Sequence, residues 1–265
     1  MPTVVANGIA IHYERAGEGP RLLFCNGTGA TLATSGLLLD VFRARFDVAA
    51  HDQRGLGRTE IPPGPYAMAD YADDALALAD ALEWDTFRLA GISFGGMVAQ
   101  ELAVTRPDRV ERLALLCTSA GGEAGSSYPL QDLKELLPAE RAETAVRLLD
   151  TRFTPEWLAG HPGDRALVEM FAGRARAESS SEARRGELAQ VDARSHHDVA
   201  ARLGRITCPT LVASGRYDGI APLPNSEAIA ARIAGSELRV YEGGHAFVAQ
   251  DPAAFPEILD FLAAG

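Results

Sequence analysis

The chain has 265 residues, of which 47% are apolar and 23% are charged, and its formal net charge is −11. A chain of this length and composition can bury one large core, which predicts a soluble globular protein. Acidic residues outnumber basic ones 36 to 25, and this excess excludes nucleic acid and anionic membrane surfaces as expected partners, because both bind clustered positive charge.

No apolar run approaches the length of a membrane span, and the N-terminus has no basic segment followed by an apolar core. We therefore expect a cytoplasmic protein. The three cysteines, Cys25, Cys117 and Cys208, lie far apart in or beside apolar runs. This spacing favours buried, reduced thiols over a disulfide or a metal site.

The first 120 residues alternate strand-like runs with helical patterns. Residues 3–16 predict a β-hairpin around Asn7-Gly8, a dipeptide that tolerates the positive φ angles of a tight turn. Apolar periodicity then predicts strands at 21–25, 46–50, 87–90 and 110–117, and helices at 35–45, 70–83 and 94–105. Such alternation is typical of a mostly parallel sheet flanked by helices.

This alternation stops between residues 121 and 205, where the pattern predicts helices at 130–137, 138–149, 164–177 and 182–196. It resumes with strands at 210–214 and 237–241 and helices at 225–233 and 252–262. We therefore expect an α/β core made of residues 1–120 and 206–265, with a helical cap of residues 121–205 inserted in it. The cap would cover the carboxyl ends of the strands, where reactive groups gather in parallel sheets.

Ser93 is the candidate nucleophile. It is the centre of a Gly-x-Ser-x-Gly sequence, residues 91–95, placed between a predicted strand and a predicted helix. A sharp strand-turn-helix connection lifts such a serine clear of the sheet, and the residues two before and two after it must be small because strand and helix nearly touch. Gly91 and Gly95 meet that requirement.

A serine hydroxyl needs a base to activate it and an acid to orient the base. Asp218 follows the predicted strand 210–214, and His245 follows the predicted strand 237–241. The order Ser93, Asp218, His245 is that expected when an elbow serine is completed by later strand-end loops. Glu242 is a rival acid close to His245, but its place beside the strand end suits it poorly for reaching across the site.

The tetrahedral oxyanion formed during acyl transfer also needs preorganised donors. The predicted strand 21–25 ends in Asn26-Gly27-Thr28-Gly29, a glycine-rich turn that we expect to face the elbow. Its candidate donors are the backbone amides of Thr28 and of Phe94, the residue after the nucleophile.

These segments make nearly the whole chain resemble the α/β-hydrolase-fold family. The resemblance also rests on residues 52–59, which are similar to the family's structural Asp-x-Arg-Gly-x-Gly-x-Ser/Thr loop. It implies an α/β-hydrolase fold, Ser93 as nucleophile, Asp218 as acid, His245 as base, and the Thr28 and Phe94 amides as oxyanion hole. Many members have His-Gly where this chain has Asn26-Gly27. That asparagine and residues 115–120 are similar to the 3-oxoadipate enol-lactonase group.

The resemblance implies hydrolysis of a small-molecule carboxylic ester or lactone without a cofactor or a metal. Dehalogenating and epoxide-opening relatives carry Asp at the nucleophile position, and cyanohydrin-cleaving relatives use a lysine, whereas the only lysine here, Lys134, lies in the expected cap. Three alternatives stay open: a carbon–carbon bond hydrolase of vinylogous diketones, a cofactor-free perhydrolase or haloperoxidase, and a ligand-sensing protein without turnover. No pattern indicates an oligomeric state.

The expected cap offers candidates for a substrate pocket. Its apolar and aromatic candidates are Tyr128, Trp157, Met170 and Phe171, although their helical spacing favours a role in the packing of the cap itself. Arg174 and Arg176 are candidates for binding a substrate carboxylate, although the mixed charges around them favour a solvated face.

Overall fold

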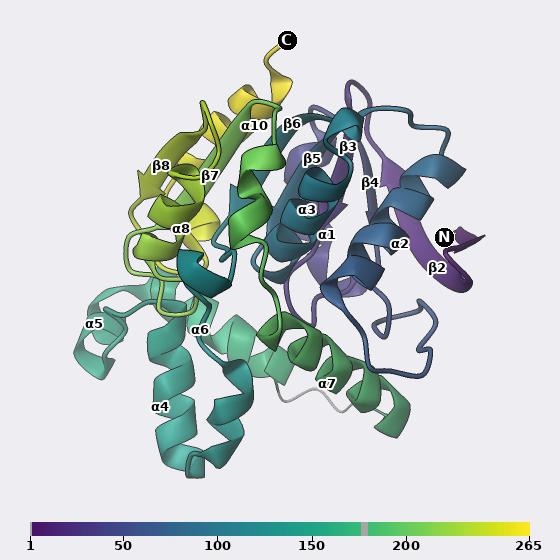
Figure 1. Ribbon diagram of the computed structural model, residues 1–265. Helices are drawn as coiled ribbons and strands as arrows, with labels where there is room; N and C mark the ends of the chain where they lie inside the picture. The colour runs from purple at the N-terminus through teal and green to yellow at the C-terminus, as the bar shows by residue number, and fades with distance from the viewer. Residues whose placement is uncertain (1, 176–179) are drawn as a thin grey trace.

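The computed structural model describes residues 2–175 and 180–265. Eight strands form one sheet in the order β1-β2-β4-β3-β5-β6-β7-β8 (Figure 1). Neighbouring strands from β4 to β8 in this order run parallel, and β1 and β2 are added antiparallel at one edge. The strands are β1 (Thr3–Ala6), β2 (Ile9–Ala16), β3 (Arg21–Cys25), β4 (Asp47–His51), β5 (Phe87–Ile92), β6 (Val110–Leu116), β7 (Thr210–Gly215) and β8 (Glu237–Tyr241). The expected mostly parallel sheet is confirmed.

The β1–β2 hairpin turns at the predicted dipeptide. Asn7 and Gly8 have φ angles of 48° and 76°, the left-handed pair that a tight two-residue turn needs. The hairpin's register pairs Ala6 with Ile9. The turn chemistry of Asn7-Gly8 therefore accounts for the hairpin.

Helices cover both faces of the sheet, and side chains alternate between two separate cores. In β3, Leu23 and Cys25 belong to one core, while Leu22 and Phe24 belong to the other. The first core is covered by α2 (Met68–Ala81), α3 (Phe94–Thr105) and α8 (Leu223–Ala230), and the second by α1 (Leu32–Arg43), α9 (Phe247–Gln250) and α10 (Ala254–Ala263). A 3₁₀ turn, η1 (Pro107–Arg109), leads from α3 to β6.

A helical insert lies between β6 and β7. Its helices α4 to α7 gather at one end of the sheet (Figure 1). Proline occupies the first position of α4, α5 and α6, where its missing N–H costs no hydrogen bond. The insert contains η2 (Gly122–Ala124), η3 (Leu130–Glu135), α4 (Pro138–Leu149), α5 (Pro155–Gly160), α6 (Pro162–Ala175), α7 (Ser181–Ser195) and η4 (Ala200–Arg205).

Some predicted boundaries were wrong; a tertiary contact explains one of them, and a proline adjacent in sequence explains another. The helix predicted at 35–45 begins at Leu32, because Asp52, distant in sequence, accepts a hydrogen bond from the Leu32 amide at 2.7 Å. The segment predicted as a helix at 130–137 is the 3₁₀ turn η3, since Pro138 starts a new helix directly after it. Helix α5 was missed because it has only six residues.

The loop after β4 joins the helices on the two faces of the sheet. Asp52 accepts from the amides of Leu32 and Arg58. Arg54 donates through Nε and Nη2 to the two carboxylate oxygens of Asp74 in α2, at 2.7 Å each. Because Asp74 is buried, its bidentate contact with Arg54 is needed to offset the cost of removing the side chain from water.

The elbow between β5 and α3 is held by contact between backbones. A Cβ on Gly91 would collide with the carbonyl of Gly95, and a Cβ on Gly95 would collide with the carbonyl of Cys25 at the end of β3. Two strands and a helix therefore meet where only hydrogen atoms fit. Ser93 sits at the turn with φ 56° and ψ −117°.

Within the described ranges, none of the helices combines the length and the apolar character that crossing a membrane requires.

Replacing Gly95 with Ala should destabilise the protein by about 3 kcal/mol, because the new methyl group must push two backbones apart. Urea unfolding measures this effect. Gly36→Ala in α1 is the control, since a Cβ there meets nothing within 4 Å and alanine favours the helix. An unfolding free energy of Gly95→Ala equal to that of the wild type would refute the close approach.

Candidate active site

The structure brings Ser93, Asp218 and His245 together at the carboxyl ends of β5, β7 and β8. The Ser93 hydroxyl lies 2.9 Å from His245 Nε2, and His245 Nδ1 lies 2.8 Å from Asp218 Oδ2. These three side chains form one continuous hydrogen-bonded chain. With Nδ1 donating to the carboxylate, Nε2 is the acceptor for the serine proton.

Asp218 is buried and its second oxygen is also occupied. Oδ1 accepts from the backbone amides of Ile220 and Ala221, both at 2.8 Å. These donors keep the carboxylate oriented toward His245. Glu242, the rival acid, is 63% exposed and pairs with Arg216 at the surface, so the acid that reaches His245 is Asp218.

The insert holds the two loops that carry the acid and the histidine. The carbonyl of Leu149, at the end of α4, accepts from the amide of His245, and the carbonyl of Leu148 accepts from that of Gly219. A Cβ on Gly244 would collide with the Leu149 carbonyl. The position of His245 thus depends on α4 as well as on β8.

Ser93 keeps its left-handed backbone through hydrogen bonds on both sides. Its amide donates to the Leu116 carbonyl at 2.8 Å. Its carbonyl accepts from the Thr118 hydroxyl, also at 2.8 Å. A non-glycine residue with this φ is strained, and the surrounding bonds must compensate for that strain.

The glycine-rich turn after β3 lies against the elbow. A Cβ on Gly27 would lie 3.6 Å from the Cβ of Ser93. In the part of the chain that the structure describes, nothing accepts a hydrogen bond from the amides of Thr28 and Phe94. The Gly29 amide, by contrast, is taken by the Gln190 side chain at 2.8 Å. Two predicted donors are free and a neighbouring one is not.

The buried face of α7 was missed from the sequence. It consists of Gly186, Gln190, Ala193 and Arg194, so it is small and polar where a core-facing helix is usually apolar. The available signal was that two polar residues, Gln190 and Arg194, stand four apart on one helical face. Gln190 contacts the glycine-rich turn, and Arg194 lines a cavity.

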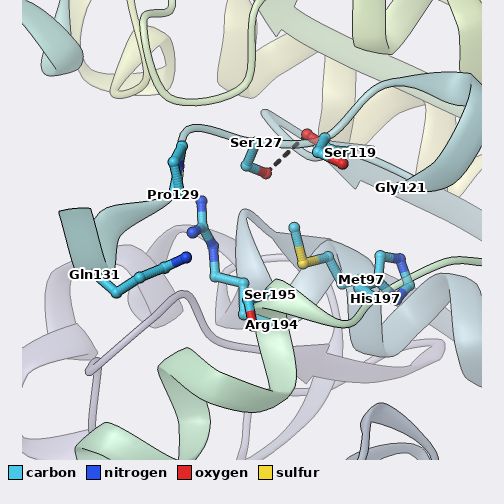
Figure 2. Close-up of a pocket in the computed structure, with 10 residues that line it drawn as sticks. Met97, Ser119, Gly121, Ser127, Pro129, Gln131, Arg194, Ser195 and His197 are labelled. Carbon is cyan, nitrogen blue, oxygen red and sulfur yellow. Dashed lines mark hydrogen bonds between the residues drawn. The ribbon is translucent and has the colours of Figure 1, made fainter.

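That cavity has a volume of about 180 Å³ and lies between α3, the start of the insert and the end of α7. Figure 2 shows the Arg194 side chain extending from α7 toward Pro129 and Gln131. Its lining residues are Met97, Ser119, Gly121, Ser126, Ser127, Pro129, Gln131, Arg194, Ser195 and His197.

The cap residues chosen from the sequence do not line this cavity. Trp157 stacks on His161 and lies under the Arg152 guanidinium, and Met170 is 44% exposed. Tyr128 contributes its carbonyl, which accepts from Arg194. These contacts agree with packing within the insert.

Phe171 is not among the cavity's lining residues either. Of the two candidate arginines, Arg176 lies outside the described residues, and only the backbone of Arg174 is described.

Cys117, Asp218 and His245 lie close enough together to be considered as metal ligands. The chemistry of the group argues against it, because both Asp218 oxygens are engaged and burial raises the pKa of the Cys117 thiol well above its usual value. A protonated thiol is a poor ligand. The three cysteines are all buried and unpaired.

Comparisons with known proteins find relatives that match nearly the whole chain. The chain is 28% identical over 261 residues to 3-oxoadipate enol-lactonase 2 of Acinetobacter baylyi, covering 97% of this chain and 94% of the relative. It is 32% identical over 263 residues to RutD of Variovorax paradoxus, whose name refers to carbamate hydrolysis, with 96% of each covered. The enol-lactonase from Burkholderia xenovorans LB400 superposes with a TM-score of 0.79 at 25% identity, covering 99% of this chain and 100% of that one.

A profile of the alpha/beta hydrolase fold matches residues 20–252, which is most of the chain and includes the serine, the acid and the histidine. The protein therefore belongs to the alpha/beta hydrolase fold family.

Proposed function

We propose that the protein is a serine hydrolase of small carboxylic esters or lactones. The observation that carries this proposal is the unbroken chain from Ser93 through His245 to Asp218, with distances of 2.9 Å and 2.8 Å. It begins at a serine on a strained elbow and ends at a buried, oriented carboxylate. That combination is the arrangement needed to activate a hydroxyl group at neutral pH.

In the first half of the reaction, Ser93 Oγ attacks the carbonyl carbon of the substrate while His245 Nε2 takes the hydroxyl proton. The amides of Thr28 and Phe94 hold the oxyanion that forms. Collapse of the tetrahedral species breaks the carbon–oxygen bond. His245 then gives its proton to the leaving oxygen, and an acyl group remains on Ser93.

In the second half, a water molecule loses a proton to His245 and attacks the acyl group, which releases the acid and restores Ser93. In a lactone the leaving alcohol stays tethered to the acyl chain. Throughout, Asp218 holds the imidazole in one tautomer and stabilises its positive charge. No step requires a metal or a cofactor.

We further propose that residues 121–205 act as a cap over this site, inserted into a core of residues 1–120 and 206–265. The hydrogen bonds from the end of α4 to the His245 loop, and from Gln190 to the glycine-rich turn, support this role. Two of the relatives named above are enol-lactonases, which favours lactones and esters as the substrate class. The substrate would enter between cap and core.

Replacing Ser93 with Ala should lower kcat for ester hydrolysis by about 10⁴-fold or more, because the nucleophile is removed, and should leave the melting temperature unchanged. We would test short 4-nitrophenyl esters, lactones and vinylogous diketones, and peroxide with an ester. Ser236→Ala, which removes a serine bonded to the Ala230 carbonyl, is the control.

Residual activity of Ser93→Ala above a tenth of the wild-type rate would contradict the mechanism. Turnover of diketones alone would identify a carbon–carbon bond hydrolase, and peracid formation would identify a perhydrolase. Binding without turnover of any substrate would identify a ligand-sensing protein.

Replacing Asp218 with Asn should lower kcat by about 10³- to 10⁴-fold, because the amide favours the imidazole tautomer in which Nε2 carries the proton and cannot accept one from Ser93. The asparagine oxygen can still accept from Ile220 and Ala221, so the loop should keep its shape. Glu242→Gln tests the rival acid in the same assay, and it should change kcat less than threefold. The reverse ranking of the two variants would show that the acid was misassigned.

A further inference from the structure

The cavity beside α7 is lined by residues that follow the elbow in α3 and follow β6. Met97, which lines it, stands one turn beyond Ser93 in α3, about 6 Å along the helix axis. Ser119, on the opposite wall, follows the threonine that bonds to the Ser93 carbonyl. The walls of the cavity therefore adjoin the backbone around Ser93.

Arg194 enters this cavity with half of its guanidinium unpaired. Arg194 as a whole is 5% exposed. Nη1 donates to the Tyr128 carbonyl at 2.9 Å, while Nε and Nη2 are buried and have no partner among residues 2–175 and 180–265. Nor does any carboxylate of those residues form an ion pair with it.

The two free nitrogens form one edge of the guanidinium, and that edge binds carboxylates in a two-point contact. The same chain shows this contact elsewhere, where Nε and Nη2 of Arg54 each donate to one oxygen of Asp74. Burying a guanidinium without such a partner is costly. Arg194 therefore presents the donor half of a carboxylate site.

The surroundings of Arg194 carry little compensating charge. Burial lowers its pKa to about 10, against an opposing effect of Asp218, so it stays positive at neutral pH. Burial also lowers the pKa of His197 to about 4, so that ring is neutral. Asp218 itself is engaged by His245 and two amides. The polar side chains lining the cavity are otherwise uncharged.

Gln131 faces Arg194 across the cavity (Figure 2). Its Oε1 is also buried without a partner in the described structure, so the two side chains do not satisfy each other.

We propose that the cavity binds a carboxylate group of the substrate, held by the Nε and Nη2 atoms of Arg194. The inference rests on the proposed hydrolase function and narrows its substrates to small anionic esters or lactones. The cavity volume of about 180 Å³ holds more than a few water molecules but is small for a drug-sized ligand.

Binding to the Ser93→Ala protein tests the proposal without turnover. We would measure by calorimetry the binding of monomethyl esters of four- to eight-carbon dicarboxylic acids and of the matching dimethyl esters. At least one monomethyl ester should bind tenfold more tightly than the matching dimethyl ester, because only the monoester has a free carboxylate that can pair with Arg194. A series in which no acid reaches this preference would overturn the proposal, whether or not the wild type hydrolyses esters.

Substrate turnover by the Arg194→Gln variant tests whether Arg194 holds the carboxylate. Two substrate pairs are compared. In 4-nitrophenyl hydrogen glutarate and its methyl ester, the free or blocked carboxylate lies on the acyl side of the bond that is cleaved. In 4-acetoxybutanoate and its methyl ester, it lies on the alcohol side. In at least one pair, the ratio of kcat/KM for the substrate with a free carboxylate to kcat/KM for its methyl ester should be tenfold or more lower in Arg194→Gln than in the wild type. Arg184→Gln, an exposed arginine on the same helix, should leave both ratios unchanged.

A fall of less than tenfold in this ratio for both pairs would overturn the assignment of Arg194. An equal loss of turnover of the charged substrate and its methyl ester would overturn it as well. Should Arg194→Gln not fold, the calorimetry on Ser93→Ala decides the proposal by itself. Absence of ester hydrolysis in the wild type would count against the proposed function alone.

Discussion

The site depends on the contact between backbones at the elbow. Gly91 and Gly95 let β5, α3 and the end of β3 approach until any Cβ would collide with a carbonyl. This approach forces Ser93 into its left-handed conformation and sets the glycine-rich turn against it. Strain at one residue is tolerated because the packing of three elements over-determines it. The proposed nucleophile and its proposed oxyanion donors thus share one geometric cause.

The other two members of the site come from strands added further along the sheet. Because β5, β6, β7 and β8 are parallel neighbours, loops after β7 and β8 reach the same edge as the elbow. The sheet alone does not set their final positions. The carbonyls at the end of α4 accept from the amides of Gly219 and His245, so the insert helps to hold the loops that carry Asp218 and His245.

Two buried arginines in this molecule differ in whether a carboxylate pairs with them. Arg54 is satisfied by Asp74 and ties the loop after β4 to α2. Arg194 is buried to a similar degree, yet the described part of the chain offers it one carbonyl and no carboxylate. A folded chain bears such a cost where a ligand can remove it. The asymmetry between these two side chains is the basis for the proposal that an anionic group of the substrate binds at Arg194.

The sequence by itself determined the sheet, the elbow and the order of Ser93, Asp218 and His245, because local periodicity and turn chemistry specify strands, helices and strand-end loops. Tertiary structure decided what depends on contacts distant in sequence. It set the start of α1 through Asp52 and turned Gln190 and Arg194 inward on a helix without an apolar stripe. Hydrogen bonds between segments distant in sequence leave no periodic trace, so only the folded chain shows which polar groups are paired and which are left for a ligand.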